Sequence, residues 1–379
     1  MNKKLLAVAV AGVLAAPTVA LAQSSVTISG AVRMSVDNVK VSQAAATRTT
    51  TSESRLNDES SSIIFSVVED LGGGLRAIVR ADWKPNFDSS ADALSGESYI
   101  GLSSNQWGRL TFGRHNFHFF KAPYDGYGKG GSLKTMPTSL VDFAGGGSVA
   151  IANATRTANS VRFNTPRWGG FELEAGYSFN PALVGGASLA EADMTAGNTA
   201  RKGRAWNLIP AFYGKNWHIA YSYWSGKADA PTAATPDQRS DSLYGYYDWG
   251  GLRIGAIWNK SKLTAAAGAL TGTQTGSRTA WSIPVNYAFG PHTIMGHYTK
   301  ARDDKATTLV QDGAKMWTLA YAYSLSKRTS LQVFASKITN DVGATYNFFT
   351  SSGGLGSTNA ALAAGEDARL YGLGMVHAF

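Results

Sequence analysis

The chain has 379 residues, of which 16% are charged and 11% aromatic, and its formal net charge is +9. Few charges and many aromatic residues disfavour an intrinsically disordered chain, and the charged fraction lies well below the ~25% of ordinary soluble domains. Cysteine is absent, which excludes disulfides, thiolate metal sites and cysteine nucleophiles.

The first 22 residues have the composition of a secretory signal peptide. Lys3 and Lys4 form a basic start, residues 5–19 are mostly apolar, and residues 20–22 (Ala-Leu-Ala) have the small residues of a cleavage site. We therefore predict export, with cleavage before Gln23. Removing the two lysines takes the formal net charge from +9 to +7. The remaining basic residues are not clustered in runs, so we expect no nucleic-acid partner.

Beyond this segment, the sequence alternates between apolar and small or polar residues with a period of two, which is typical of β-strands. The alternation is clearest over residues 26–36, 75–83, 171–179, 217–223, 281–289 and 317–325. A soluble β-sandwich would alternate too, but here the apolar face repeatedly begins or ends in Trp, Tyr or Phe, as a lipid-facing strand does. No later apolar stretch approaches the ~18 residues that a membrane helix needs, which excludes a helical membrane protein.

The connections between these strands are alternately short and long. The short ones centre on residues 71–74, 105–107, 167–169, 214–216, 249–251, 289–291 and 326–328. The long ones lie near residues 37–60, 84–96, 115–158, 180–202, 228–240, 263–277, 301–315 and 339–365. Seven short and eight long connections separate 16 strands, and in lipid such a sheet must close to pair its edges. We therefore predict an all-β fold, a 16-stranded antiparallel transmembrane β-barrel that forms a single domain over residues 23–379, after a signal peptide at 1–22.

Six segments along the chain resemble the general porins of Gram-negative bacteria, in particular those of betaproteobacteria. They are SVTISG at 25–30, EDLGGGL at 69–75, GRLTFGR at 108–114, NSVRFNTP at 159–166, LSKRT at 325–329 and GMVHAF at 374–379. The resemblance implies a homotrimeric outer-membrane channel, narrowed by an inward-folded third loop, for passive diffusion of small hydrophilic solutes and ions. It implies outer-membrane lipid and lipopolysaccharide as partners, and no enzymatic activity, metal or cofactor. Phe379 resembles the terminal assembly signal of outer-membrane barrels.

The resemblance also implies which side chains line the constriction. In the third loop, the segment that begins at Leu140 resembles the family's loop motif and assigns Asp142 to the constriction, with Asp125 as a weaker candidate. On the facing wall, Arg114 and Arg156 match arginine positions of the family. Further arginines with lumen-facing parity are Arg33, Arg76, Arg80, Arg109 and Arg162.

Two basic positions of the family are not basic in this chain. They fall on Ser62 and Glu97, and the nearby Arg55 is expected in the first loop. A charged constriction sets the entry preference of a channel. We therefore expect only a weak preference for anions.

Other motifs give weaker signals. The aromatic segment 117–120 could favour aromatic or organic-acid solutes, or it could pin the third loop to the wall. Residues 126–131 fit G-x-G-x-x-G but lack the βαβ unit of a dinucleotide site. His115 and His118 have the spacing of metal ligands without an evident third ligand. A barrel enzyme and a purely structural or adhesin barrel are the remaining alternatives.

Overall fold

The computed structural model describes residues 24–43, 48, 50–88, 94–121, 135–141, 149, 151, 154–181, 203–229, 231, 235–306, 311–348 and 362–379. The predicted signal peptide and the two loop acids, Asp125 and Asp142, lie outside this part of the chain. No helix within the described ranges is both long and apolar enough to cross a membrane.

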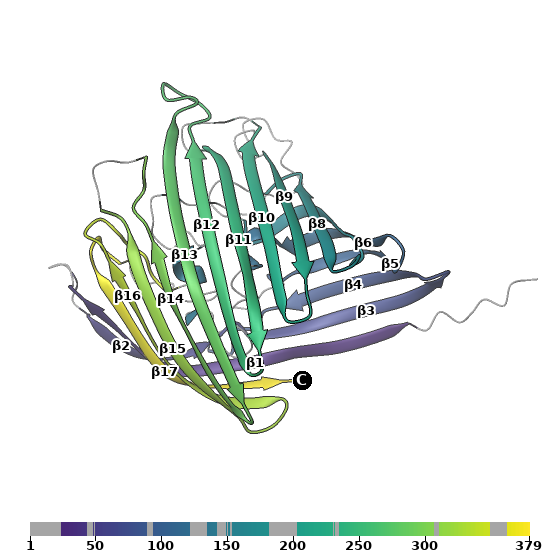
Figure 1. The fold of residues 1–379 in the computed structure, drawn as a ribbon, viewed down its shortest axis with the longest axis horizontal. Helices are drawn as coiled ribbons and strands as arrows, with labels where there is room; N and C mark the ends of the chain where they lie inside the picture. The colour runs from purple at the N-terminus through teal and green to yellow at the C-terminus, as the bar shows by residue number, and fades with distance from the viewer. Residues whose placement is uncertain are drawn as a thin grey trace, which may run out of the picture.

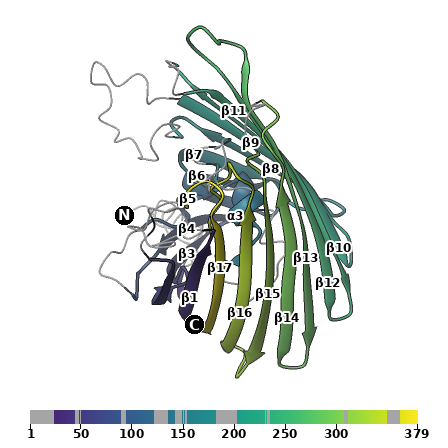
Figure 2. The same ribbon diagram turned by 90° about the vertical axis from the view of Figure 1, so that its left-hand side faces the viewer.

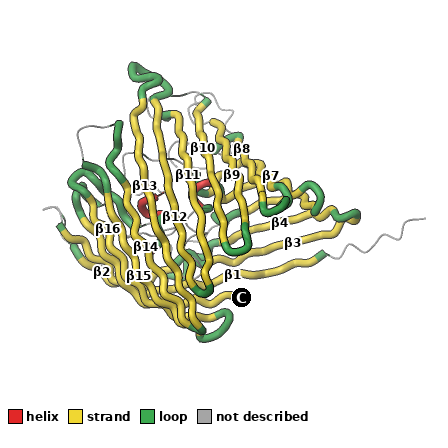
Figure 3. The backbone as a smooth tube through the Cα atoms, viewed as in Figure 1, coloured by secondary structure: helices red, strands yellow, loops and turns green. Residues whose placement is uncertain are grey.

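The described residues form one antiparallel sheet that closes on itself (Figures 1 and 3). The first strands are β1 (Ser25–Ser42), β2 (Ser52–Asp58), β3 (Ser62–Gly72), β4 (Leu75–Trp83), β5 (Ser98–Ser104), β6 (Gly108–Asn116), β7 (Arg156–Asn164) and β8 (Phe171–Ser178). The remaining strands are β9 (Gly203–Tyr213), β10 (Trp217–Ala228), β11 (Asp237–Trp249), β12 (Leu252–Thr264), β13 (Gln274–Phe289), β14 (His292–Ala301), β15 (Ala314–Ser324), β16 (Thr329–Asn340) and β17 (Asp367–Ala378).

Closure is made by β17, which pairs with β1 along residues 31–42 and lies beside it in Figure 2. At the end of this ladder, Gly30 and Phe379 exchange both backbone hydrogen bonds, at 3.0 and 3.1 Å. Strands β2 and β3 both pair with β1 and therefore count as one interrupted strand. The interruption at residues 59–61 holds one residue more than the facing stretch of β1, and Ser60 takes a positive φ of 66°, as in a β-bulge. The predicted closed 16-stranded barrel is thus confirmed.

All seven predicted short connections are found between the strands, but the first long connection is shorter than predicted. The sequence predicts a loop over 37–60, whereas β1 continues to Ser42 and β2 begins at Ser52. The predicted position of Arg55 in this loop is therefore wrong. Arg55 lies in β2, and its Nε is 3.5 Å from the Asp37 carboxylate of β1. The error has a physical cause: both strand ends carry polar residues on the outward face, which hides the alternation.

The two faces of the sheet divide by chemistry. The outward face carries exposed apolar side chains, from Val26 on β1 to Trp317 on β15. The inward face carries small polar residues that bond to one another across strands. Asn259, for example, donates from Nδ2 to the hydroxyls of Ser240 and Ser242 at 2.9 and 2.8 Å. Buried polar groups are tolerated because they are paired in this way.

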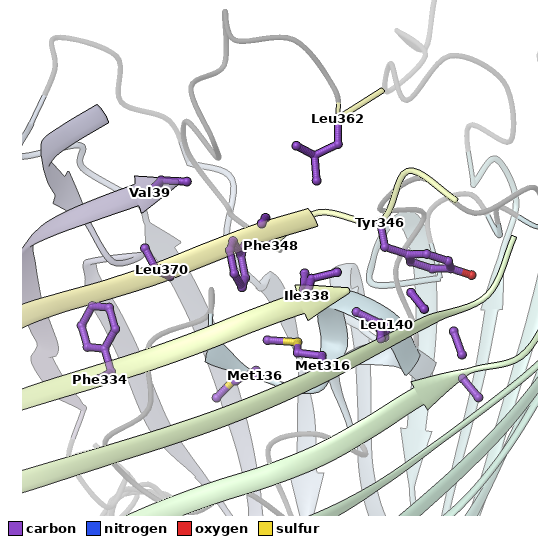
Figure 4. Close-up of a cluster of buried hydrophobic side chains, with 14 of the residues drawn as sticks. Val39, Met136, Leu140, Met316, Phe334, Ile338, Tyr346, Phe348, Leu362 and Leu370 are labelled. Atoms are coloured by element: carbon purple, nitrogen blue, oxygen red, sulfur yellow. The ribbon is translucent and has the colours of Figure 1, made fainter. Parts of the chain in front are cut away.

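Two described segments of the third long connection pack against buried side chains of the strands. They are the short helices η1 (His118–Phe120) and α3 (Thr138–Val141). Figure 4 shows Met136 and Leu140 among the buried side chains Met316 and Ile338, which belong to β15 and β16. This apolar cluster holds the described part of the connection at α3 against the strands.

The closing ladder gives a testable prediction. A Cβ atom at Gly30 would stand 2.1 Å from the Ser62 carbonyl oxygen, and backbone cannot move away as a flexible side chain can. We expect Gly30→Val to prevent closure, measured as loss of the folded, heat-shifted band in gel electrophoresis. Ile28→Val, two residues away on the outward face, is the control and should keep that band. A folded Gly30→Val protein would contradict this account of closure.

Candidate functional site

Four basic side chains gather on one side of the barrel: Arg33 of β1, Lys84 just after β4, Arg114 of β6 and Arg156 at the start of β7. We call these four residues the basic cluster. Arg156 is close enough to repel the positive charges of both Lys84 and Arg114. Arg33 acts on Lys84 in the same way. Three strands and the residue that follows β4 thus place positive charge at one region of the wall.

Lys84 is the one lysine of the basic cluster, and its side chain is 19% exposed. Its Nζ lies 3.1 Å from the Asp82 carboxylate. Burial is the main effect that lowers the pKa of Lys84; the charges of Arg156 and Arg33 lower it further, whereas Asp82 raises it. Burial and the neighbouring arginines therefore destabilise the charged form of Lys84, and Asp82 offsets this destabilisation only in part.

The arginines of the basic cluster are held by different partners. Arg33 donates from Nη1 to the Ser60 carbonyl at 3.3 Å, in the bulge between β2 and β3. The Arg156 guanidinium lies over the Phe120 ring, 4.8 Å from its centroid, which is a cation–π contact. The buried Nε of Arg114 has no hydrogen-bond partner among the described residues.

Glu97, which stands where the resemblance expected a base, lies between two arginines. Its carboxylate accepts a 2.6 Å hydrogen bond from Arg162 Nη1 and lies 3.8 Å from Arg80 Nε. It also accepts from the backbone N–H of Asn116. Two arginines around one carboxylate leave a positive charge, so Glu97 does not make this wall acidic.

The other predicted arginines are more dispersed. Arg76 lies beside a short turn and donates to Asn105 at 3.0 Å. Arg109 donates to Asn164 at 3.3 Å. Within the described part of the chain, neither interacts with the basic cluster. The structure therefore brings together Arg33, Arg114 and Arg156, and separately Arg80, Glu97 and Arg162.

Three charged residues at these sites were not predicted from the sequence. Lys84 lies two residues after Asp82 and four after Arg80, so it has the same inward parity, and the alternation in the sequence indicates this position. Glu174 also has inward parity; it accepts hydrogen bonds from Lys121 at 2.9 Å and from Asn164 at 3.0 Å. Lys121 belongs to the third connection, whose local sequence does not indicate where its side chains point.

The aromatic segment at the start of the third connection is buried rather than open to solute. Phe117 and Phe119 pack in a cluster with Trp224 of β10. His118 Nδ1 and the Ser222 hydroxyl are hydrogen bonded at 2.7 Å. Burial lowers the pKa of His118 to about 3, so the ring is neutral at physiological pH. Of the two interpretations of this segment, the structure supports the one in which it pins the loop.

The region of α3 has its own polar anchors. His297 Nε2 of β14 donates to the Thr135 carbonyl at 2.7 Å. Arg278 of β13 donates to the Val141 carbonyl at 3.2 Å. Because η1 is fixed to β10 and α3 to β13 and β14, these two segments of the connection are attached to different parts of the wall.

The two candidate metal-ligand histidines are used in packing. Both ring nitrogens of His115 lie within hydrogen-bond distance of hydroxyls, Ser160 at 2.8 Å and Thr111 at 2.9 Å. His118 turns instead toward Ser222 on another strand. The two imidazoles therefore do not point at a common position, and no group of three potential ligands forms among the described residues.

Comparison with known proteins places this geometry in context. A family model described as Gram-negative porin matches residues 7–343. The chain is 28% identical to outer membrane porin protein 32 of Delftia acidovorans, over 87% of this chain and 88% of the relative. It is 25% identical to an outer membrane porin protein of Bordetella pertussis, over 72% and 75% of the two chains. The structure of an anion-selective porin from Comamonas acidovorans aligns with a TM-score of 0.71 at 22% identity, covering 94% of this chain and 100% of the other.

The root of the third connection gives a second prediction. A Cβ at Gly176 would stand 2.3 Å from the Phe117 ring. We expect Gly176→Val to displace this ring and loosen the root, so that single-channel currents in planar bilayers become noisier and the open conductance rises. Ala175→Val, which adds two methyl groups to the outward face of β8, should leave currents unchanged. Wild-type currents from a correctly folded Gly176→Val protein would contradict the anchoring role of Phe117.

Proposed function

The chain belongs to the family of Gram-negative porins, and on that premise we propose that its basic cluster gives the channel a weak preference for anions. As a porin, the protein forms an outer-membrane channel for passive diffusion of small hydrophilic solutes and ions, and it is not an enzyme. Export by the signal peptide at 1–22 and assembly through Phe379 belong to the same proposal.

The single observation that carries the proposal is the gathering of Arg33, Lys84, Arg114 and Arg156, in which Lys84 pairs with Asp82. A low-dielectric wall focuses the field of such a group into the lumen and raises the local concentration of anions. Conduction also requires that an anion attracted by the basic cluster can leave it again. The anion selectivity of the Comamonas acidovorans porin supports the sign of this preference.

The expected preference is weak because acids lie on the same wall. Glu59 accepts a 2.6 Å hydrogen bond from the Ser35 hydroxyl near Arg33, and Asp58 accepts from the backbone N–H of Ser61. We propose that the third connection, whose segments η1 and α3 are attached to β10 and β14, narrows the lumen opposite the basic cluster. Asp125 and Asp142, in that connection, would oppose the cluster across the lumen.

Reversal potentials in a KCl gradient test the selectivity. We expect a small anion preference in the wild type, and Lys84→Ala and Arg156→Ala should each shift it toward cations, with a larger shift in the double variant. Glu97→Gln should shift it the other way, because Arg80 and Arg162 would lose their shared carboxylate. Lys262→Ala removes an outward-facing charge and is the control.

Two outcomes would contradict this proposal. One is marked cation selectivity of the wild type, which would mean that the loop and wall acids dominate. The other is an unchanged reversal potential in the Lys84→Ala and Arg156→Ala double variant. A variant that carries no current at all would not be one of these outcomes, because it would show that the protein had failed to insert into the bilayer.

We propose in addition that the protein is a homotrimer, centred on the first strands. The outward faces of β1 and β3–β6 expose Val, Ile, Leu and Phe, but no strongly exposed Trp or Tyr. By contrast, β9–β15 and β17 expose Trp or Tyr on most strands, including Trp206, Tyr247 and Trp317. A lipid-facing strand needs such residues at the membrane boundaries, and a strand that faces another protein does not.

The trimer proposal predicts where charge disrupts assembly. Replacing Val32 and Val79 by Arg should yield monomers in unheated gel electrophoresis, because both positions would be buried against a neighbouring subunit. Arg at Tyr221 or Tyr323 should impair membrane insertion instead. A trimer that resists the first pair, or crosslinks that map the interface to β10–β15, would refute this arrangement.

A further inference from the structure

The last long connection of the chain, between β16 and β17, is described at residues 341–348 and 362–366. These two parts are joined by the backbone, because the N–H of Gly365 donates to the Ala344 carbonyl at 3.0 Å. We call the two parts together the last connection. Its backbone is therefore paired with itself where it leaves the barrel.

The side-chain amide of Asn340, the final residue of β16, fixes the last connection further. Its Nδ2 donates to the carbonyls of Tyr346 and Glu366, at 2.9 and 2.7 Å. Its Oδ1 accepts from the backbone N–H of Tyr346 at 3.1 Å. Because both backbone groups of Tyr346 are bonded to one strand residue, the direction of the Tyr346 side chain is set from β16.

The last connection buries its large apolar side chains together with those of the third connection. Tyr346, Phe348 and Leu362 are almost fully buried, although loops usually run over the surface. They belong to the same cluster as Met136 and Leu140, and Figure 4 shows them around this group of side chains. Two connections that are distant in sequence therefore share one apolar cluster, whose burial stabilises both.

A buried arginine joins the same two connections by hydrogen bonds. Arg278 of β13 is 2% exposed and lies in no ion pair with the described residues. Its guanidinium donates from Nη1 to the Tyr346 hydroxyl and from Nη2 to the Val141 carbonyl, both at 3.2 Å. Burying a charge is unfavourable unless its donors are paired, so Tyr346 stabilises Arg278 in the orientation that reaches Val141 at the end of α3.

We propose that Tyr346 is a positioning residue of the third connection, through which the last connection holds α3 in place. The Tyr346 ring packs in the cluster that contains Leu140, and the hydroxyl orients the Arg278 guanidinium toward Val141. Displacement of the last connection would then free α3 as well. The effect on the current rests on the proposed narrowing of the lumen by the third connection, whereas the position of α3 does not.

The chain contains no cysteine, so a single introduced thiol can report on α3. Thr138 in α3 is 1% exposed, and its hydroxyl has no hydrogen-bond partner among the described residues. Thr138→Cys therefore removes no described bond. The probe is iodoacetamide, a small uncharged reagent whose local concentration the basic cluster does not change. Its rate of reaction is measured on the purified protein in detergent.

In the Thr138→Cys background, Tyr346→Ala should raise the alkylation rate at least about tenfold, because α3 separates from the cluster more often. Tyr346→Phe keeps the ring and removes only the acceptor for Arg278, so we expect a rise of about threefold. Val342→Ala is the matched control, since Val342 lies in the same connection but is 72% exposed. This control should keep the rate of the background protein.

Two results would overturn the proposal. One is an unchanged alkylation rate in a Tyr346→Ala protein that shows the heat-shifted band of the folded barrel. The other is an equal rise in the Val342→Ala control. If Tyr346→Ala does not give the folded band, Tyr346→Phe decides alone, and an unchanged rate in that variant would overturn the proposal.

Single-channel currents separate this inference from the proposed function. If the third connection narrows the lumen, Tyr346→Ala should also make the open current noisier in planar bilayers. Faster alkylation with an unchanged current would support the role of Tyr346 and contradict the narrowing of the lumen. Reversal potentials of the wild type bear on the anion preference alone, so the two proposals can fail separately.

Discussion

The structure depends on backbone pairing. In the hydrocarbon core no water is available for an exposed N–H or C=O group, and each unpaired group costs several kcal/mol. The pairing of β17 with β1 removes the last open edge, and the bulge between β2 and β3 is accommodated without breaking the ring. Once closure is imposed, strand parity fixes which side chains face lipid and which face the lumen.

Strand parity alone would give a wide lumen lined by polar residues throughout. The inward-facing positions that are apolar instead therefore decide where the third connection attaches. The inner wall is apolar where the third connection lies on it, at Met316 and Ile338 on one side and at Trp224 on another. The hydroxyl of Ser222 and the imidazole of His297 provide directional bonds at the same two places. Side chains of the strands therefore position the third connection, and the conformational propensities of its own sequence do not decide where it lies.

The sequence predicts the barrel well and the site only in part. Strand number, the seven short turns and the inward parity of Arg33, Arg80 and Arg162 follow from a period of two, which is local information. The end of β1 escapes prediction because its outward residues are polar above the membrane boundary. The positions of Lys121 and Glu174 escape it because ion pairs between a loop and a strand depend on tertiary folding, which periodicity does not encode.

Lys84 shows how a charge can keep its place in space while its sequence position changes. The ladder between β3 and β4 ends with the pair Ile63 and Trp83, and Ser62 and Lys84 are the next residues beyond that pair. The arginine that the resemblance expects at Ser62 is therefore absent from β3, but a cation follows the neighbouring strand β4 at the same end of the ladder. Both positions face the lumen, and a field focused by the wall depends on where charge lies rather than on which strand carries it. Comparing aligned positions one at a time would count this charge as lost, whereas Lys84, beside Asp82, still places a positive charge at this end of β3 and β4.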